Sequence, residues 1–114
     1  MQYEITMTTC WDEDTGEEML CLTEDRSRSM GILRFGHEFD LTLKKDLSFR
    51  SASSIDCGEA SSYRREADFE AAYPGVLKEI REAAKSKRLH VRRYHWNGVR
   101  NESEVIPYES YIGG

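Results

Sequence analysis

An alternation of large and small side chains near the start of the chain constrains the fold more than any other feature. A period of two puts alternate side chains on opposite faces of a β-strand, so residues 3–11 are predicted to form a strand. A polar, glycine-bearing segment and a second apolar stretch, residues 19–23, then predict a β-hairpin. The large residues of the first strand are Tyr3, Ile5, Met7, Thr9 and Trp11.

Burial determines the register that we expect for this hairpin. With Thr15–Gly16 as a two-residue loop, Trp11 faces Leu20, and Leu20 and Leu22 then share the apolar face of the first strand. A shift of the pairing by one residue would move both leucines to the opposite face. The pairing that keeps one face apolar is therefore predicted.

Three further short apolar segments extend this hairpin into a predicted N-terminal meander. Residues 30–35, 39–43 and 47–49 each have the composition of a short strand, which makes four or five strands in the first fifty residues. Residues 51–62 are rich in Ser, Ala and Gly and are predicted to be a loop.

The second half of the chain predicts one main helix and a strand pair. Apolar residues recur on one stripe of a helix at about residues 74–86, with Pro74 at its first position, and residues 63–72 predict a turn or short helix before it. Residues 89–96 and 105–108 then predict a pair of strands, of which Pro107 restricts the second to a sheet edge.

Together these elements predict the α+β class. A chain of 114 residues with 39% hydrophobic residues is large enough for one core, so residues 1–114 are expected to form a single domain. The expected architecture is a mostly antiparallel sheet with the main helix packed on its apolar face and a C-terminal strand pair.

Charge is distributed unevenly along the chain. The formal net charge is -5, yet the first 25 residues contain eight acidic residues and no Lys or Arg, whereas residues 85–93 contain five basic residues and no acidic one. The simplest use of this pattern is that folding brings the two regions together. A negative net charge also gives no overall attraction to nucleic acid or to an anionic membrane.

The acidic segment is predicted to lie at the tip of the first hairpin. Its spacing does not match a calcium-binding EF-hand loop, because glycine stands at the fifth position and Thr23 at the twelfth. Two interpretations stay open, a solvated tip and a surface that binds a basic protein. The candidate partner-binding residues are Asp12, Glu13, Asp14, Glu17 and Glu18.

Motifs for catalysis, metal binding and cofactor binding are absent from the sequence. The three histidines and three cysteines lack zinc-ligand spacing, and no glycine-rich phosphate loop occurs. A cysteine nucleophile would also need a histidine base, which no spacing supplies. We therefore expect no catalytic residue, no metal, no cofactor and no enzymatic activity.

The cysteines and the N-terminal sequence predict a cytoplasmic protein. Cys10, Cys21 and Cys57 are an odd number without a C-x-x-C pair, which favours free thiols in a reducing compartment. The N-terminal segment is acidic and lacks the apolar stretch of a secretory signal, and no spanning segment is evident, so no membrane partner is expected.

A second candidate surface lies in residues 85–96, where basic and aromatic residues alternate. Such a mixture suits phosphates and stacked bases of a single-stranded nucleic acid, although a helix end followed by a strand produces the same pattern. On a strand, three of these residues share one face. The candidates are Arg88, Arg92, Arg93, Tyr94 and Trp96, of which Arg92, Tyr94 and Trp96 share the face.

The last four residues, Tyr111-Ile112-Gly113-Gly114, resemble the tails of ubiquitin-like and sulfur-carrier proteins. The resemblance implies a terminal carboxylate that is adenylated and conjugated. It also implies a β-grasp fold, in which one hairpin precedes the helix, whereas four or five strands are predicted before the helix here.

A small, non-enzymatic protein-binding module is the function that these features favour. Toxin-immunity proteins and phage-encoded inhibitors of host defence have this size and character, and the expected partner is a protein with a basic surface that the acidic tip occludes. Nucleic-acid binding through residues 85–96 and a carrier role for the terminal Gly-Gly are the alternatives. Short edge strands leave pairing with a second copy open.

Overall fold

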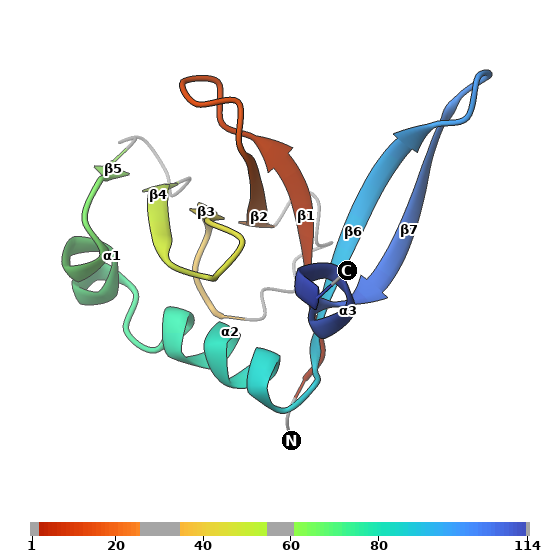
Figure 1. Cartoon of the computed structure of the whole chain (residues 1–114). Coiled ribbons are helices and arrows are strands. Elements are labelled where there is room, and N and C mark those ends of the chain that lie inside the picture. The colour runs from red at the N-terminus through yellow and green to blue at the C-terminus, as the bar shows by residue number, and fades with distance from the viewer. Residues whose placement is uncertain (1–2, 26–34, 55–60, 114) are drawn as a thin grey trace.

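The computed structural model describes residues 3–25, 35–54 and 61–113, which form one α+β fold with a seven-stranded, mostly antiparallel sheet (Figure 1). The strand order is β5-β4-β3-β2-β1-β6-β7. The strands are β1 (Ile5–Trp11), β2 (Glu18–Glu24), β3 (Phe39–Leu43), β4 (Phe49–Ser54), β5 (Ser62–Tyr63), β6 (Leu89–Trp96) and β7 (Asn101–Pro107). The helices are α1 (Glu66–Ala72), α2 (Val76–Lys85) and α3 (Tyr108–Gly113).

The first hairpin forms as predicted, but its strands pair two residues away from the expected register. Thr9 pairs with Leu20 and Trp11 with Glu18, because the loop has four residues between Asp12 and Glu17 instead of the two expected. A shift of two keeps every side chain on its predicted face, so Leu20 is fully buried as expected.

Trp11 was expected on the buried face and is instead 70% exposed. The alternation of the strand continues to Trp11, but the buried core includes only Ile5 and Met7 of β1. Tyr3, at the other end of the alternating segment, is also exposed. A periodic pattern indicates which face a residue occupies, whereas the neighbouring elements decide whether that face is covered.

Strand prediction in the middle of the chain is partly confirmed and partly wrong. Residues 39–43 form β3 as predicted, while the strand predicted at 30–35 lies outside the described residues except for its last position. Leu47 belongs to a turn with a φ of 70°, and the strand begins at Phe49. The predicted loop at 51–62 is wrong at both ends, since Ser51–Ser54 belongs to β4 and Ser62 to β5.

Strand β4 was predicted as a loop because most of its side chains are small. Ala52 faces the core and is buried, while Ser51 and Ser53 lie on the other face. Strand β3 pairs with Ser51–Ser54 and, after an irregularity at Arg50, with Phe49. Main-chain pairing supplies the stability that these small residues lack, which is why composition alone predicted a loop.

Helix α2 confirms the main predicted helix, with one correction at its start. Pro74 was expected at the first helical position, but it precedes the N-cap residue Gly75, which has a φ of 88°. Helix α1 confirms the short helix predicted before it. Helix α3 was not predicted, because Tyr108 was assigned to the last strand and instead begins the helix.

The core lies between α1, α2 and one face of the sheet. An aromatic cluster surrounds Phe69 of α1, whose ring contacts Phe39, Phe49, Tyr63 and Tyr73 at centroid distances of 5.3 to 5.9 Å. The largest fully buried aliphatic residues come from the four central strands and from α2. The opposite face of β1–β4 carries hydroxyl and sulfur side chains, among them Thr8, Cys10, Cys21, Thr42 and Ser51.

The two hairpins β1–β2 and β6–β7 diverge towards their tips (Figure 1). Strands β1 and β6 pair in parallel. This pairing is short, because it joins only Ile5–Thr8 of β1 to Leu89–Arg92 of β6. Beyond that point each hairpin is a two-stranded projection. The predicted C-terminal strand pair is confirmed as β6–β7, and Pro107 ends the edge strand β7 as predicted.

Among the described helices, none has the length and apolar character needed to cross a membrane.

Candidate functional site

The tip of the β1–β2 hairpin contains the five acidic residues predicted to bind a partner. The Asp12 amide donates to the Glu17 carbonyl and the Gly16 amide donates to the Asp12 carbonyl, both at 2.8 Å, which closes a four-residue loop. Gly16 has a φ of 73°, a conformation that a side chain disfavours. The loop is therefore held by its own main chain.

Asp12 is engaged within the protein. Its carboxylate lies 2.7 Å from Nε of Arg50, and its side chain is only 7% exposed. The hydrogen bond from Arg50 and that from the Asp14 amide hold the pKa of Asp12 below its ordinary value of 3.8. Arg50 comes from β4, so this contact anchors the hairpin to the sheet beside it.

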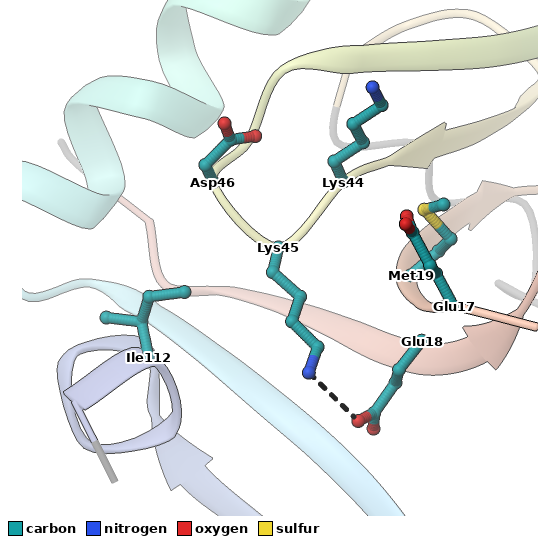
Figure 2. Close-up of a pocket in the computed structure, with 7 residues that line it drawn as sticks. All are labelled: Glu17, Glu18, Met19, Lys44, Lys45, Asp46 and Ile112. Carbon is teal, nitrogen blue, oxygen red and sulfur yellow. Dashed lines mark ion pairs between the residues drawn. The ribbon is translucent and has the colours of Figure 1, made fainter.

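Glu18 is the second acidic residue with an internal partner. Its carboxylate lies 3.6 Å from Nζ of Lys45, at the rim of a hollow of about 400 Å³ (Figure 2). Three acidic and two basic residues line the hollow, together with Met19 and Ile112. These acidic and basic side chains largely compensate one another's charge, so the hollow does not offer a ligand a group of charges of one sign.

The three remaining acidic residues, Glu13, Asp14 and Glu17, are exposed. Asp14 lies 3.6 Å from Arg50, but its side chain is 86% exposed, so solvent screens most of the attraction. Folding does bring the two charged regions side by side, since β1 pairs with residues 89–92 and His90 lies 3.7 Å from Glu4. The tip itself finds its partners in the β3–β4 turn and β4. The tip thus keeps a negative surface beside the exposed Trp11.

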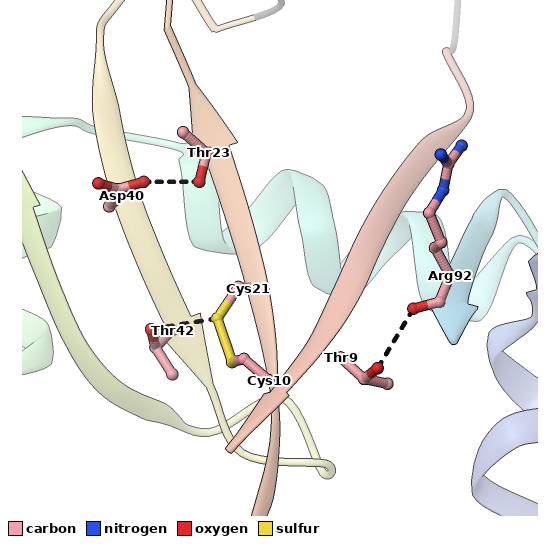
Figure 3. The surroundings of a disulfide bond; sticks show 7 residues. All are labelled: Thr9, Cys10, Cys21, Thr23, Asp40, Thr42 and Arg92. Atoms are coloured by element: carbon pink, nitrogen blue, oxygen red, sulfur yellow. Dashed lines mark hydrogen bonds between the residues drawn. A yellow bond between two sulfur atoms is a disulfide. The ribbon is translucent and has the colours of Figure 1, made fainter. Parts of the chain in front are cut away.

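A disulfide joins β1 and β2 below this tip (Figure 3), which corrects the expectation of free thiols for Cys10 and Cys21. The observed register places the two residues diagonally across the hairpin, with a Cα–Cα distance of 6.3 Å. That distance falls within the range that a disulfide bridges. Cys57 lies outside the described residues.

The basic and aromatic segment divides into structural and exposed residues. Arg88 donates to the Tyr3 carbonyl at 2.6 Å, and the Arg93 guanidinium lies 5.8 Å from the Tyr111 ring centroid, so both support the fold. Tyr94 and Trp96 are exposed by 56% and 64%. The register confirms that they share a face with Arg92, which lies opposite Thr8 and Val105.

Helix α3 and its tyrosines are the part of this region that sequence reasoning missed. Tyr108 donates a hydrogen bond to the Lys45 carbonyl, and burial raises the pKa of Tyr111 to about 12. Gly113 is the last residue of the helix, and Gly114 lies outside the described residues. The terminal carboxylate that the resemblance to carrier proteins implied to be conjugated belongs to Gly114 and is therefore not described.

The histidines do not gather into a site. His90 lies 3.7 Å from Glu4, and His95 lies 3.6 Å from Glu102 on the other hairpin strand. The His37 ring lies 5.1 Å from that of Tyr73. Over residues 3–25, 35–54 and 61–113, no group of three or more His, Cys, Asp and Glu side chains is arranged to hold a metal ion.

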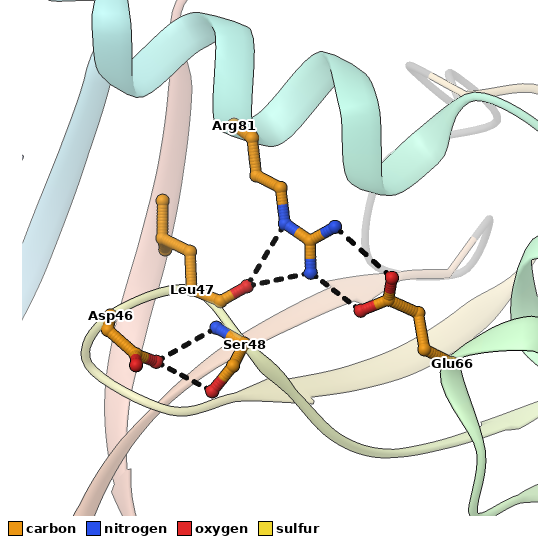
Figure 4. A network of polar contacts seen from close by, with 5 residues as sticks. All are labelled: Asp46, Leu47, Ser48, Glu66 and Arg81. Atoms are coloured by element: carbon orange, nitrogen blue, oxygen red, sulfur yellow. Dashed lines mark hydrogen bonds and ion pairs between the residues drawn. The ribbon is translucent and has the colours of Figure 1, made fainter.

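One further polar network has a structural role. The Arg81 guanidinium donates to the Leu47 carbonyl and to the Glu66 carboxylate, so it ties α2 to the β3–β4 turn and to α1 (Figure 4). Asp46 accepts from the amide and hydroxyl of Ser48 in the same turn. The Arg81 hydrogen bonds attach α1 and α2 to the β3–β4 turn, and the Asp46 hydrogen bonds hold the turn itself.

The Asp12–Arg50 contact predicts how stability depends on pH. Because the folded state lowers the pKa of Asp12, its ionised form contributes stability that is fully present above the unfolded pKa, near pH 4, and lost as the pH falls through the lower folded value. We expect Asp12→Asn to lower the melting temperature at neutral pH and to lose this difference between about pH 4 and pH 2.

Thermal melts of the wild type and variant across that pH range measure this effect. Glu13→Gln is the matched control, because its carboxylate is exposed at the same tip and the change in charge is the same. A difference between wild type and Asp12→Asn that stayed constant down to pH 2 would contradict the ion pair.

Comparison of the chain with protein-family models, with curated proteins and with solved structures finds no match.

Proposed function

We propose that the chain is a small, non-enzymatic protein-binding module of the inhibitor or immunity type, and that the β1–β2 tip occludes a basic surface of its partner protein. The observation that carries this proposal is an anchored hairpin whose tip keeps exposed charge. Asp12 and Glu18 face internal cations, while Glu13, Asp14 and Glu17 face solvent.

The anchoring favours binding because it reduces the entropy lost on association. The Asp12–Arg50 ion pair and the main-chain bonds of the loop restrict the hairpin before a partner arrives, and the Cys10–Cys21 bond adds a further restraint wherever it is oxidised. A surface that is already ordered loses less conformational entropy on binding, so more of the favourable contact energy contributes to affinity.

Trp11 supplies the apolar part of the proposed contact. It is 70% exposed on the last residue of β1, directly before the acidic loop. Tryptophan is enriched among the residues that contribute most to protein interfaces, where charged neighbours form the rim. An indole beside three carboxylates fits a basic groove that contains an apolar pocket, such as the nucleic-acid channel of a nuclease.

Electrostatic attraction between the acidic tip and a basic partner would mainly increase the association rate. Complementary charge raises the association rate, and salt at about 0.15 M screens exposed charges beyond about 8 Å. Capture of the partner should therefore weaken as salt increases.

Charge reversal at the tip tests the proposal. We expect the triple variant Glu13→Lys, Asp14→Lys, Glu17→Lys to lose at least about tenfold in affinity for the partner, because like charges then face each other. The wild type, immobilised and exposed to extract from its native cells or their host, should retain a basic protein in a near one-to-one ratio. Mass spectrometry identifies that protein, and titration with it measures the affinity.

A matched variant separates the tip from net charge. Asp68→Lys, Glu79→Lys, Glu82→Lys makes the same change of charge at exposed positions of α1 and α2 and should retain the partner. Equal retention by both triple variants, or equal loss from both, would overturn the role of the tip.

The two alternatives from the sequence have less support from the geometry. Nucleic-acid binding would use Arg92, Tyr94 and Trp96, but Arg88 and Arg93 are engaged within the protein. The described residues add no support for a carrier role, because the terminal carboxylate that it would use belongs to Gly114. A protein partner therefore remains the proposal.

We also propose a cytoplasmic location, which the redox state of Cys10 and Cys21 tests. In that reducing compartment Cys10 and Cys21 would be held as thiols, whereas a disulfide that persists in freshly isolated protein favours an oxidising compartment. The thiol count described in the Discussion distinguishes these cases.

A further inference from the structure

Among the described strands, β7 forms one edge of the sheet, with no further strand paired to its outer main-chain groups. It is the last strand in the order β5-β4-β3-β2-β1-β6-β7, and it pairs with β6 over seven consecutive residues without a bulge. A regular edge strand of this length can accept a further strand, and natural proteins protect such edges when they are not used.

The turn of the hairpin determines which main-chain groups of β7 point outward. The Asn97 amide donates to the Arg100 carbonyl at 3.1 Å, so this pair is hydrogen-bonded. Bonded and non-bonded pairs alternate along an antiparallel ladder, so every second residue of β7 from Asn101 directs its N–H and C=O away from β6. The residues with outward groups are Asn101, Ser103 and Val105.

Pro107 is the next and last residue of β7 in this outward series. It occupies the next outward position, opposite His90, where its missing N–H removes no bond to β6. The free edge therefore extends from the turn to Val105. It has the length of a short peptide strand.

The two faces of β7 have different chemistry. On one face, Val105 is 48% exposed, and Tyr94 and Trp96 of β6 lie opposite the small residues Ser103 and Asn101. Those small residues cover little of either ring. A strand added to β7 would thus find an apolar surface on this face.

The other face has acidic residues on β7 and basic residues on β6. Glu104 lies opposite Arg93 and Glu102 opposite His95, with Ile106 beyond them, so the acidic side chains are those next to the edge. Glu104 is exposed, whereas Glu102 accepts a hydrogen bond from Asn97 and lies 3.7 Å from Arg100. A strand with basic side chains on this face would match the charge of Glu104.

The same carboxylates disfavour a second copy of the chain as the occupant. Two antiparallel copies of β7 that join through their outward residues and overlap along most of the strand place Glu102 opposite Glu104, or one of these glutamates opposite its own copy. Like charges directly opposite each other destabilise a sheet. The edge therefore selects a different chain.

We propose that β7 binds an extended segment of another protein as an eighth strand of the sheet. The segment has apolar side chains on the face of Val105, Tyr94 and Trp96 and Lys or Arg on the face of Glu104. This surface is separate from the acidic tip, so either proposal can fail without the other.

Synthetic peptides provide the probe. A heptapeptide with alternating Lys and Val should bind, while an alternating Glu and Val heptapeptide should not. Amide hydrogen exchange followed by NMR gives a specific readout, because the outward amides of Ser103 and Val105 should be unprotected in the free protein and become protected with the Lys–Val peptide. The Glu102 and Glu104 amides, which face β6, should be protected in both states.

Proline at an outward position tests the strand addition. Val105→Pro removes one outward N–H and obstructs the incoming strand, but leaves the bonds to β6, so we expect the affinity for the Lys–Val peptide to fall at least about tenfold. Val105→Thr keeps the N–H and should retain binding. Unchanged protection of the Glu104 amide in the proline variant confirms that the hairpin remains folded.

Charge reversal and the tip variant complete the test. Glu104→Lys should lose the Lys–Val peptide and gain the Glu–Val peptide, and the tip triple variant should bind the Lys–Val peptide as the wild type does. Binding that survives Val105→Pro, or that disappears with the tip variant, would overturn the proposal. So would preferential binding of single-stranded oligothymidine on Tyr94 and Trp96.

Discussion

Replacing Phe69 by alanine should lower the free energy of unfolding by about 3–5 kcal/mol, the largest effect expected of any single substitution described here. Phe69 is fully buried on α1 and contacts four aromatic rings that belong to β3, β4, β5 and the segment after α1. Its removal leaves a cavity that these rings can fill only in part. The loss is a large fraction of the 5–15 kcal/mol that stabilises a typical domain.

Urea denaturation followed by circular dichroism measures this loss. Tyr94→Ala is the matched control, since it removes an aromatic ring of similar size from an exposed position and should change the stability by no more than about 0.5 kcal/mol. If the two substitutions had similar costs, Phe69 would not be the centre of the core.

Loss of the Cys10–Cys21 bond should have the second-largest effect. The bond closes a loop with a sequence separation of 11, for which the chain-entropy model gives about 2.5–3 kcal/mol. Cys10→Ser, Cys21→Ser should therefore melt at a lower temperature than the oxidised wild type. Treatment with dithiothreitol should lower the wild type towards the double variant and leave the double variant unchanged.

A count of thiols tests the bond directly. Denatured protein that was isolated without reductant should show one reactive thiol of its three cysteines if the bond is present and Cys57 is unpaired. Three reactive thiols would restore the expectation drawn from the sequence and would support a reducing compartment.

Several features were predictable because they depend on local pattern. The period of two in β1 and the helical stripe of α2 each reflect one element packing on one core, so the α+β class, the main helix and the C-terminal strand pair are confirmed. The acidic residues were placed at a hairpin tip for the same reason. Which of them stay exposed depends on Arg50 and Lys45, which are distant in sequence.

The errors share one physical cause, the dependence of local structure on distant partners. β4 is a strand because β3 pairs with it, although its serines favour a loop. The register of the first hairpin is shifted by two because its turn has four residues, although Cys10 and Cys21 are close enough to bond in either register. Helix α3 forms where Tyr108 and Tyr111 pack beside the β3–β4 turn.

The sequence by itself determined the fold class, the faces of the first hairpin and the position of the acidic tip, because periodicity and charge are properties of neighbouring residues. Only the tertiary structure decided which basic residues lie beside Asp12 and Glu18, that Trp11 is exposed, and which main-chain groups of the predicted edge strand point away from β6. Those properties depend on contacts between elements distant in sequence, where burial and pairing override local preference.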